Sequence, residues 1–159
     1  MASTIGTATL TVTLTEAVTL NGSNHGATNI VTFSAINEVS KRIVTITTTE
    51  STIATFSAAV ASAGHYVAAD VRYIRFTNLD DTNFITLTFR NQDNDEAAIK
   101  VDAGQSFIFN GDNANGMTAV MNATQDADAA SSANFGSLTN IQADADTGSC
   151  DLEMVIASV

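Results

Sequence analysis

Residues 71–109, VRYIRFTNLDDTNFITLTFRNQDNDEAAIKVDAGQSFIF, decide the fold of this chain. Short runs rich in β-branched and aromatic residues, VRYIRFTN, ITLTFRN, IKV and SFIF, are separated by polar turns such as LDDTNF, QDNDEAA and DAGQ. Alternation at a period of two residues predicts strands. Ile85, Leu87 and Phe89 fall on one face of their strand, so we expect the core of the domain to lie here.

The N-terminal segment predicts a strand of the same kind. Leu10, Val12 and Leu14 alternate with threonines, which is typical of a half-buried strand. The sequence NGSNHG at 21–26 supplies turn residues that tolerate positive φ, and IVTFSAI then resumes the extended pattern. We therefore expect a hairpin or a strand-loop-strand.

The remaining segments predict strands with one long interruption. IVTITTT at 43–49 is apolar on both faces near its start, which favours a central strand. Residues 51–69 predict a strand followed by a loop or one helical turn, and 150–159 predict a final strand. Between them, residues 117–146 are small and polar, so we expect a long excursion over the surface.

Length and composition indicate a single all-β domain. The chain has 159 residues, of which 45% are apolar and only 14% charged, and threonine suits a pleated, half-exposed surface. We expect one antiparallel β-sandwich over residues 1–159, with long loops and at most a short helix. The absence of proline leaves edge strands able to pair with another chain. Residues 1–20 are therefore a candidate intersubunit strand or arm, with Leu10, Val12 and Leu14 as interface candidates.

Charge and cysteine content exclude several classes of protein. The formal charge of −11 opposes nucleic-acid binding, and no basic residue follows Lys100. A single cysteine, Cys150, allows no intrachain disulfide. The first ten residues lack a basic region and a continuous apolar region, and no stretch approaches 18 apolar residues, so we expect neither a leader peptide nor a membrane span. We expect synthesis in a cytoplasm.

No catalytic or cofactor motif stands out. His25 and His65 are isolated loop histidines, and a hydrolase built on Asp93 and Glu96 has no framing pattern. We therefore expect no enzymatic activity and no cofactor. The weak calcium candidates are Asp144, Asp146 and Asp151, although DADTGSCDLE departs from a calcium loop after its first three alternate positions.

Three aromatic residues are further interface candidates. Tyr66, Tyr73 and Phe135 could offer stacking surfaces for a protein or a sugar. A glycan- or receptor-binding module would add polar contacts from Asp80, Asp81 and Asn83. The chain has no tryptophan, the side chain most useful to a sugar-binding platform, so this alternative starts weaker.

The run at 71–109 resembles small virion proteins of tailed bacteriophages. The likeness is carried by the turn at 78–81, the turn at 103–106 and the aromatic strand with Phe107 and Phe109, about a quarter of the chain. It implies a jelly-roll-like sandwich and a structural role in the virion, as a capsid decoration or cement protein or as a tail, neck or fibre component. The implied partners are further copies of the chain, for example in a trimer, and the major capsid protein or other virion proteins. Ala103 stands where proline is common in that pattern.

Overall fold

The computed structural model describes residues 6–112, 115–118 and 137–159, and these ranges are built of strands and turns without a helix. In chain order the strands are β1 (Ala8–Thr15), β2 (Thr19–Leu20), β3 (Ser23–Asn24), β4 (Thr28–Ile36), β5 (Glu38–Ile46), β6 (Ser51–Ser57), β7 (His65–Val67), β8 (Val71–Asn78), β9 (Ile85–Asn91), β10 (Glu96–Val101), β11 (Ser106–Asn110), β12 (Leu138–Ala145) and β13 (Cys150–Ser158). In these ranges there is also no helix of the length and apolarity needed to cross a membrane.

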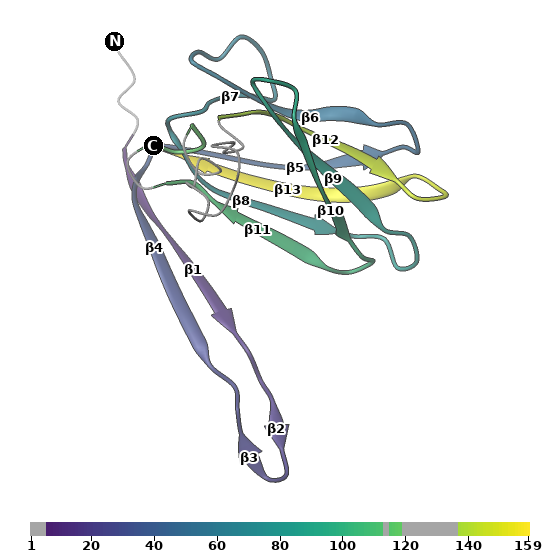
Figure 1. Cartoon of the computed structure of the whole chain (residues 1–159). Helices are drawn as coiled ribbons and strands as arrows, with labels where there is room; N and C mark the ends of the chain where they lie inside the picture. Colours follow the sequence, from purple (N-terminus) through teal and green to yellow (C-terminus); the bar gives the residue numbers. More distant parts are fainter. Residues whose placement is uncertain (1–5, 113–114, 119–136) are drawn as a thin grey trace, which may run out of the picture.

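Two sheets pack face to face and form the body of the molecule (Figure 1). One has the order β10-β9-β12-β6-β7 and the other the order β11-β8-β13-β5. Every neighbouring pair is antiparallel except β6 and β7, which are parallel. The expectation of an antiparallel β-sandwich is confirmed.

The strand pairing is that of a jelly roll. β5 pairs with β13, β6 with β12, β8 with β11 and β9 with β10. These pairs are nested along the chain, from the outermost pair β5–β13 to the adjacent pair β9–β10. Two four-stranded sheets, β5-β13-β8-β11 and β6-β12-β9-β10, result from this wrapping. The short β7 extends the second sheet.

The core lies between the sheets, where the sequence predicts it. Ile85, Leu87 and Phe89 of β9 are fully buried, and alternation turns the threonines between them outward. The Phe89 ring meets Phe107 and Phe109 of the opposite sheet edge to face, with centroids 5.8 and 5.4 Å apart. Burying each such side chain contributes roughly 1.5–3 kcal/mol.

Asn78 explains why the turn after β8 has its sequence. Its side chain is fully buried, and Nδ2 donates to the carbonyls of Asn83 (2.8 Å) and Val101 (3.2 Å). Its Oδ1 accepts the Asp80 amide at 3.0 Å. This one amide side chain therefore ties β8, the following turn and the end of β10 together.

Two sequence expectations about the sheets are wrong. In the described part of the chain β5 is an edge strand that pairs with β13 alone, not a central strand, and its apolar Ile43 points outward and is exposed. Residues 138–145, expected within the surface excursion, form the central strand β12. Its inward positions include Ala143 and Ala145, whose small side chains give little hydrophobic signal in the sequence. Residues 119–136 of the expected excursion lie outside the described residues.

β4 and β5 form one long, bent path that leaves the body. Only Asn37 separates them, and its amide donates to the Ser158 carbonyl at 3.0 Å. β5 continues into the sandwich, while β4 runs outward beside β1 (Figure 1). The junction thus joins a projecting ribbon directly to the sheet.

Candidate functional site

A hairpin arm, defined here as residues 8–36, projects from the sandwich (Figure 1). β1 pairs with β4, and β2 with β3, in one register that is unshifted from Leu10↔Phe33 to Leu20↔Ser23. Asn21 and Gly22 close the ribbon with φ values of 50° and 79°. Such left-handed values at both central residues are what a two-residue hairpin turn needs. The expected hairpin is confirmed, and the arm includes residues up to 36 instead of ending at 20.

The arm has one apolar face. Directly opposed residues point to the same side, and successive residues point to opposite sides. Leu10, Val12 and Leu14 therefore share a face with Val31 and Phe33, while the other face is lined with threonine hydroxyls. Because the register is unshifted, Val18 and Leu20 lie on the same face near the tip, and Glu16 interrupts the apolar side chains between Leu14 and Val18. Four of these side chains are substantially exposed: Leu14 52%, Val18 52%, Leu20 60% and Val31 37%.

The root of the arm is fixed to the outer face of the four-stranded sheet. Phe33 and Ile36 are buried there against Tyr73 and Ala157. The Phe33 and Tyr73 rings lie 6.0 Å apart at a tilt of 50°. Apolar packing and an offset aromatic pair hold the arm where it leaves the body.

A bulge bends the arm away from the sheet. The register shifts between Ala8↔Ile36 and Leu10↔Phe33, which inserts one extra residue into β4. Ala35 takes a φ of 59° within this bulge, a strained conformation for a residue with a Cβ. The bulge redirects β4, so the rest of the ribbon leaves the surface.

An apolar groove lies between the arm and β11. It has a volume of about 170 Å³ and is lined by Val12, Leu14, Asn29, Val31, Phe33, Ile108 and Asn110. Aliphatic side chains from the arm face Ile108 of β11 across it, and no charged residue lines it. The groove, continuous with the apolar face of the arm, is a surface suited to another apolar segment.

The rest of the outer face carries a charge network beside exposed apolar side chains. Glu153 of β13 accepts hydrogen bonds from Lys41 (2.9 Å) and Arg75 (2.5 Å). The hydrogen bonds from Lys41 and Arg75 hold the pKa of the Glu153 carboxyl below its usual value. Val39 and Ile43 of the β5 edge are exposed on the same side of the sheet. A charged edge strand of this kind resists uncontrolled strand pairing.

The structure corrects two of the predicted interface residues. Tyr66 and Tyr73 are each only 5% exposed. The Tyr66 hydroxyl donates to Ser40 at 3.1 Å inside the sandwich, and the arm covers Tyr73. Burial within the chain leaves neither ring free to stack on a partner. Phe135 lies outside the described residues. Leu10, Val12 and Leu14 lie on the apolar face of the arm, and their role at an interface stays a prediction.

The predicted calcium residues do not form a site. In the described ranges no three His, Cys, Asp or Glu side chains gather closely enough to hold a metal ion, and this includes Asp144, Asp146 and Asp151. Asp151 instead accepts a hydrogen bond from the Thr45 hydroxyl at 2.9 Å. Burial, reinforced by Glu50, raises the pKa of Asp144.

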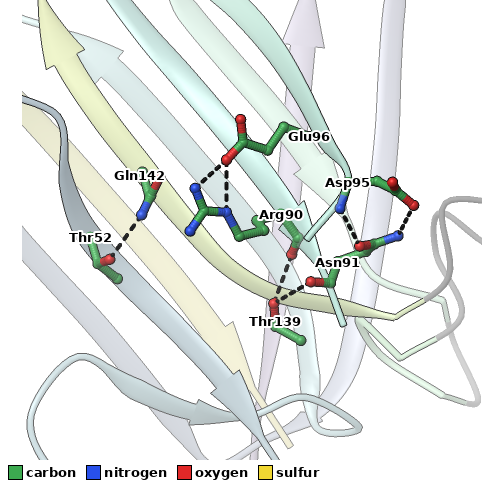
Figure 2. Close-up of polar contacts among 7 residues, drawn as sticks. All are labelled: Thr52, Arg90, Asn91, Asp95, Glu96, Thr139 and Gln142. Carbon is green, nitrogen blue, oxygen red and sulfur yellow. Dashed lines mark hydrogen bonds and ion pairs between the residues drawn. The ribbon is translucent and has the colours of Figure 1, made fainter. Parts of the chain in front are cut away.

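Two carboxylates that were candidates for other functions have structural partners: Asp80, considered for a glycan-binding module, and Glu96, considered for a hydrolase. The Asp80 carboxylate accepts the amides of Asn83 (2.6 Å) and Thr82 (2.8 Å), and these bonds hold its pKa below the usual value. The Glu96 carboxylate accepts Nε of Arg90 at 2.8 Å. Asp80 thus stabilises the turn after β8. Glu96 stabilises the pairing of β9 with β10 through its contact with Arg90 (Figure 2).

Figure 2 shows the polar outer face of the five-stranded sheet. Asn91 organises the turn before β10, because its Oδ1 accepts the amides of Asp93 and Asp95 and its Nδ2 donates to the Asp95 carboxylate. Gln142 of β12 donates to the Thr52 hydroxyl at 3.5 Å. Nearby, the acceptor oxygens of Asn140 and Gln142 are buried without a hydrogen-bond partner in the described part of the chain.

A second cavity, of about 410 Å³, lies where β5 approaches β6 and the loop before β7. It is lined by Arg42, Val44, Thr52, Ile53, Ala54, Thr55, Ala63, Gly64 and His65. The Arg42 guanidinium donates to the Ile53 carbonyl and lies against Gly64. Arg42 therefore links β5 of one sheet to β6 of the other.

Comparisons with protein-family models, with curated proteins and with solved structures found no significant match to this chain. The functional conclusion therefore depends on the geometry of the arm, the groove and the two sheet faces, together with the resemblance of residues 71–109.

Proposed function

We propose that the chain is a non-enzymatic structural subunit of a virion, and within that class a capsid decoration or cement protein that stabilises the shell through oligomeric contacts. The observation that carries the proposal is the arm, a ribbon that leaves the body and exposes the apolar side chains of Leu14, Val18, Leu20 and Val31. A soluble monomer gains nothing from such a ribbon, whereas an assembly subunit buries it against a neighbour.

The jelly-roll sandwich, as the scaffold that carries the arm, supports the same proposal. Jelly rolls occur in capsid proteins and also in lectins, so the fold alone carries only an analogy. The stretch that resembles tailed-phage virion proteins, residues 71–109, supplies the core strands β8 to β11. The likeness therefore concerns the scaffold, and the arm supplies the contacts.

The partners proposed are further copies of the chain together with the major capsid protein or another virion protein. The arm, residues 8–36, carries one formally charged side chain, that of Glu16. Apolar burial therefore dominates the contacts proposed for the arm. The remaining formal charge of the chain suits docking onto a basic patch of a shell. Localisation in the virion follows, after synthesis in the host cytoplasm.

The content of purified virus particles tests this role. Mass spectrometry of gradient-purified particles of the phage that encodes the chain should find it at a copy number comparable to that of the shell protein. A copy number near that of a tail or neck component would favour the tail, neck or fibre alternative within the same class. Particles that lack the chain, with the protein left in the supernatant, would overturn the virion role.

A glycan- or receptor-binding module is the second candidate function. The favouring observation is the hydroxyl- and amide-rich outer face of the five-stranded sheet, where the Gln142 side-chain amide donates to the Thr52 hydroxyl (Figure 2). Hydroxyl and amide side chains of this kind exchange hydrogen bonds with sugar hydroxyls. A glycan array probed with and without calcium should show binding that Gln142→Ala abolishes; an array without binding removes this candidate.

A further inference from the structure

We infer that Asn21, at the tip of the arm, is a site of spontaneous deamidation, and that the fold directs this reaction to Asn21 and away from the other Asn–Gly pairs of the chain. The sequence has three such pairs: Asn21–Gly22, Asn110–Gly111 and Asn115–Gly116. The chemistry belongs to the chain itself and does not depend on the proposed virion role.

The reaction needs an accessible backbone amide after the asparagine. The nitrogen of the following residue loses its proton and attacks Cγ of the asparagine side chain. A C–N bond forms and closes a succinimide ring, and the side-chain nitrogen leaves as ammonia with that proton. Water then adds to one of the two ring carbonyls and opens the ring, which gives aspartate or isoaspartate. Glycine favours the attack, because it has no side chain to shield the nitrogen or to restrict the backbone.

The pair at the arm tip lies in open surroundings. Asn21 and Gly22 are both exposed, and a Cβ on Gly22 would meet nothing within 4 Å. The described residues hold no hydrogen-bond acceptor for the Gly22 amide. Solvent therefore reaches both the attacking nitrogen and the side-chain carbonyl carbon, and it can take up the proton and supply the water.

The other two glycines are packed against backbone of the body. The Gly111 amide donates to the Arg72 carbonyl at 2.9 Å, and a Cβ on Gly111 would lie 2.2 Å from the Val71 carbonyl oxygen. The Gly116 amide donates to the Asp112 carbonyl at 2.9 Å, and a Cβ on Gly116 would lie 2.4 Å from a backbone oxygen. In both pairs the attacking nitrogen is held in a hydrogen bond, and the backbone cannot rotate without displacing its neighbours.

The tip is also easier to open than the body. The left-handed turn at Asn21 and Gly22 fixes the backbone between Cγ and the attacking nitrogen, so the turn must relax before the ring can close. Only the two-residue strands β2 and β3 adjoin this turn, and a lone two-stranded hairpin is marginally stable in water. Asn110, by contrast, pairs with Tyr73 in the ladder between β11 and β8. Local opening therefore costs less at the tip than in the sandwich.

Both products change the tip of the arm. Aspartate adds a negative charge beside Leu20, whose side chain is 60% exposed. Isoaspartate also lengthens the backbone by a methylene, and a two-residue turn with left-handed φ values at both central positions does not accommodate it. The modification thus limits how long an uncovered arm keeps its apolar, ordered tip.

Peptide mapping by mass spectrometry, during incubation of the folded full-length chain at mildly alkaline pH, tests the site. Deamidation of Asn21 should be more than about tenfold faster than that of Asn110 or Asn115, because the tip opens locally and a tenfold ratio needs a difference of only about 1.4 kcal/mol. The chain unfolded in guanidinium chloride should lose this selectivity. Comparable rates in the folded chain, or an Asn21 that stays unmodified while the unfolded chain reacts, would overturn the inference.

A disulfide clamp tests the requirement for an open tip. The His25 amide donates to the Val18 carbonyl, so the adjacent pair Thr19↔Asn24 is a non-hydrogen-bonded one, with Cα atoms about 4.5 Å apart and within reach of a disulfide. In Thr19→Cys combined with Asn24→Cys, oxidation should slow the deamidation of Asn21, and reduction should restore the faster rate. The same variant is its own control. Equal rates in the two redox states would contradict the route through the open tip.

Discussion

The rings of Phe33 and Tyr73 lie 6.0 Å apart at the point where the arm meets the sandwich. Phe33 belongs to β4 of the arm and Tyr73 to β8 of the four-stranded sheet. The bulge at Ala35 lies between this contact and the junction with β5, so the bulge and the ring pair together set the angle at which the arm leaves the body. Burial also raises the pKa of the Tyr73 hydroxyl.

Replacing Phe33 should release the arm while the sandwich remains folded. Phe33→Ala removes a side chain that is 6% exposed, and truncations of buried Phe cost about 3–5 kcal/mol. The loss is expected in arm docking, so hydrogen exchange should accelerate at 8–36 and stay slow in β9 and β12. Thr11→Ala, on the opposite face, is the control. Equal acceleration throughout the body would show that the arm is part of the cooperative core.

Replacing Asn78 should destabilise the whole sandwich. Asn78→Ala leaves the carbonyls of Asn83 and Val101 without their donor, and each lost buried hydrogen bond costs about 1–3 kcal/mol. Urea unfolding should show a fall in the free energy of unfolding of that order or more. Asn110→Ala, at an exposed position, should stay within about 0.5 kcal/mol of the wild type. Similar values for both variants would contradict the structural role of Asn78.

Glu153 should contribute a pH-dependent stability. Its pKa is below the ordinary value of 4.5 in the folded chain, so its contribution is present above pH 4.5 and is lost as pH falls through the folded pKa. Glu153→Gln should be less stable than wild type at neutral pH, with the difference shrinking below pH 4.5 in urea unfolding series. A difference that stays constant with pH would show that the carboxylate charge is not responsible.

Gly26 should be required midway along the arm. A Cβ at this position would lie 2.2 Å from the Glu16 carbonyl oxygen, so Gly26→Ala must displace one strand of the ribbon. Amides near the tip, including that of His25, should then exchange faster, while the body keeps its unfolding midpoint. Gly6→Ala, where a Cβ meets nothing within 4 Å, is the matched control. Unchanged exchange at the tip would contradict the close approach of the two strands.

The strands that the sequence predicts well are those with bulky alternating residues. Ile85, Leu87 and Phe89 are buried as expected because their period of two matches the pleat of β9. The sequence does not predict β12, because two of its four buried apolar residues, Ala143 and Ala145, have small side chains that give little hydrophobic signal beside Leu138 and Ile141. A local pattern carries little information on strand positions that are buried through small side chains.

The candidate site was predictable only in part. The apolar alternation at Leu10, Val12 and Leu14 and the Asn21–Gly22 turn are local signals, and they correctly indicate a hairpin. That the ribbon leaves the body depends on the bulge at Ala35, which has no signal in the sequence. The local sequence predicts Tyr73 as an interface residue, because Phe33, which covers it, is distant in the sequence.

Electron cryomicroscopy of the encoding phage tests the central claim most directly, namely that this jelly roll is a virion subunit and that its arm makes the assembly contact. The account predicts density for the sandwich across the shell lattice, with the arm of each copy buried against a neighbouring subunit. A shell without this density, or copies whose arms project into solvent and touch no neighbour, would contradict it.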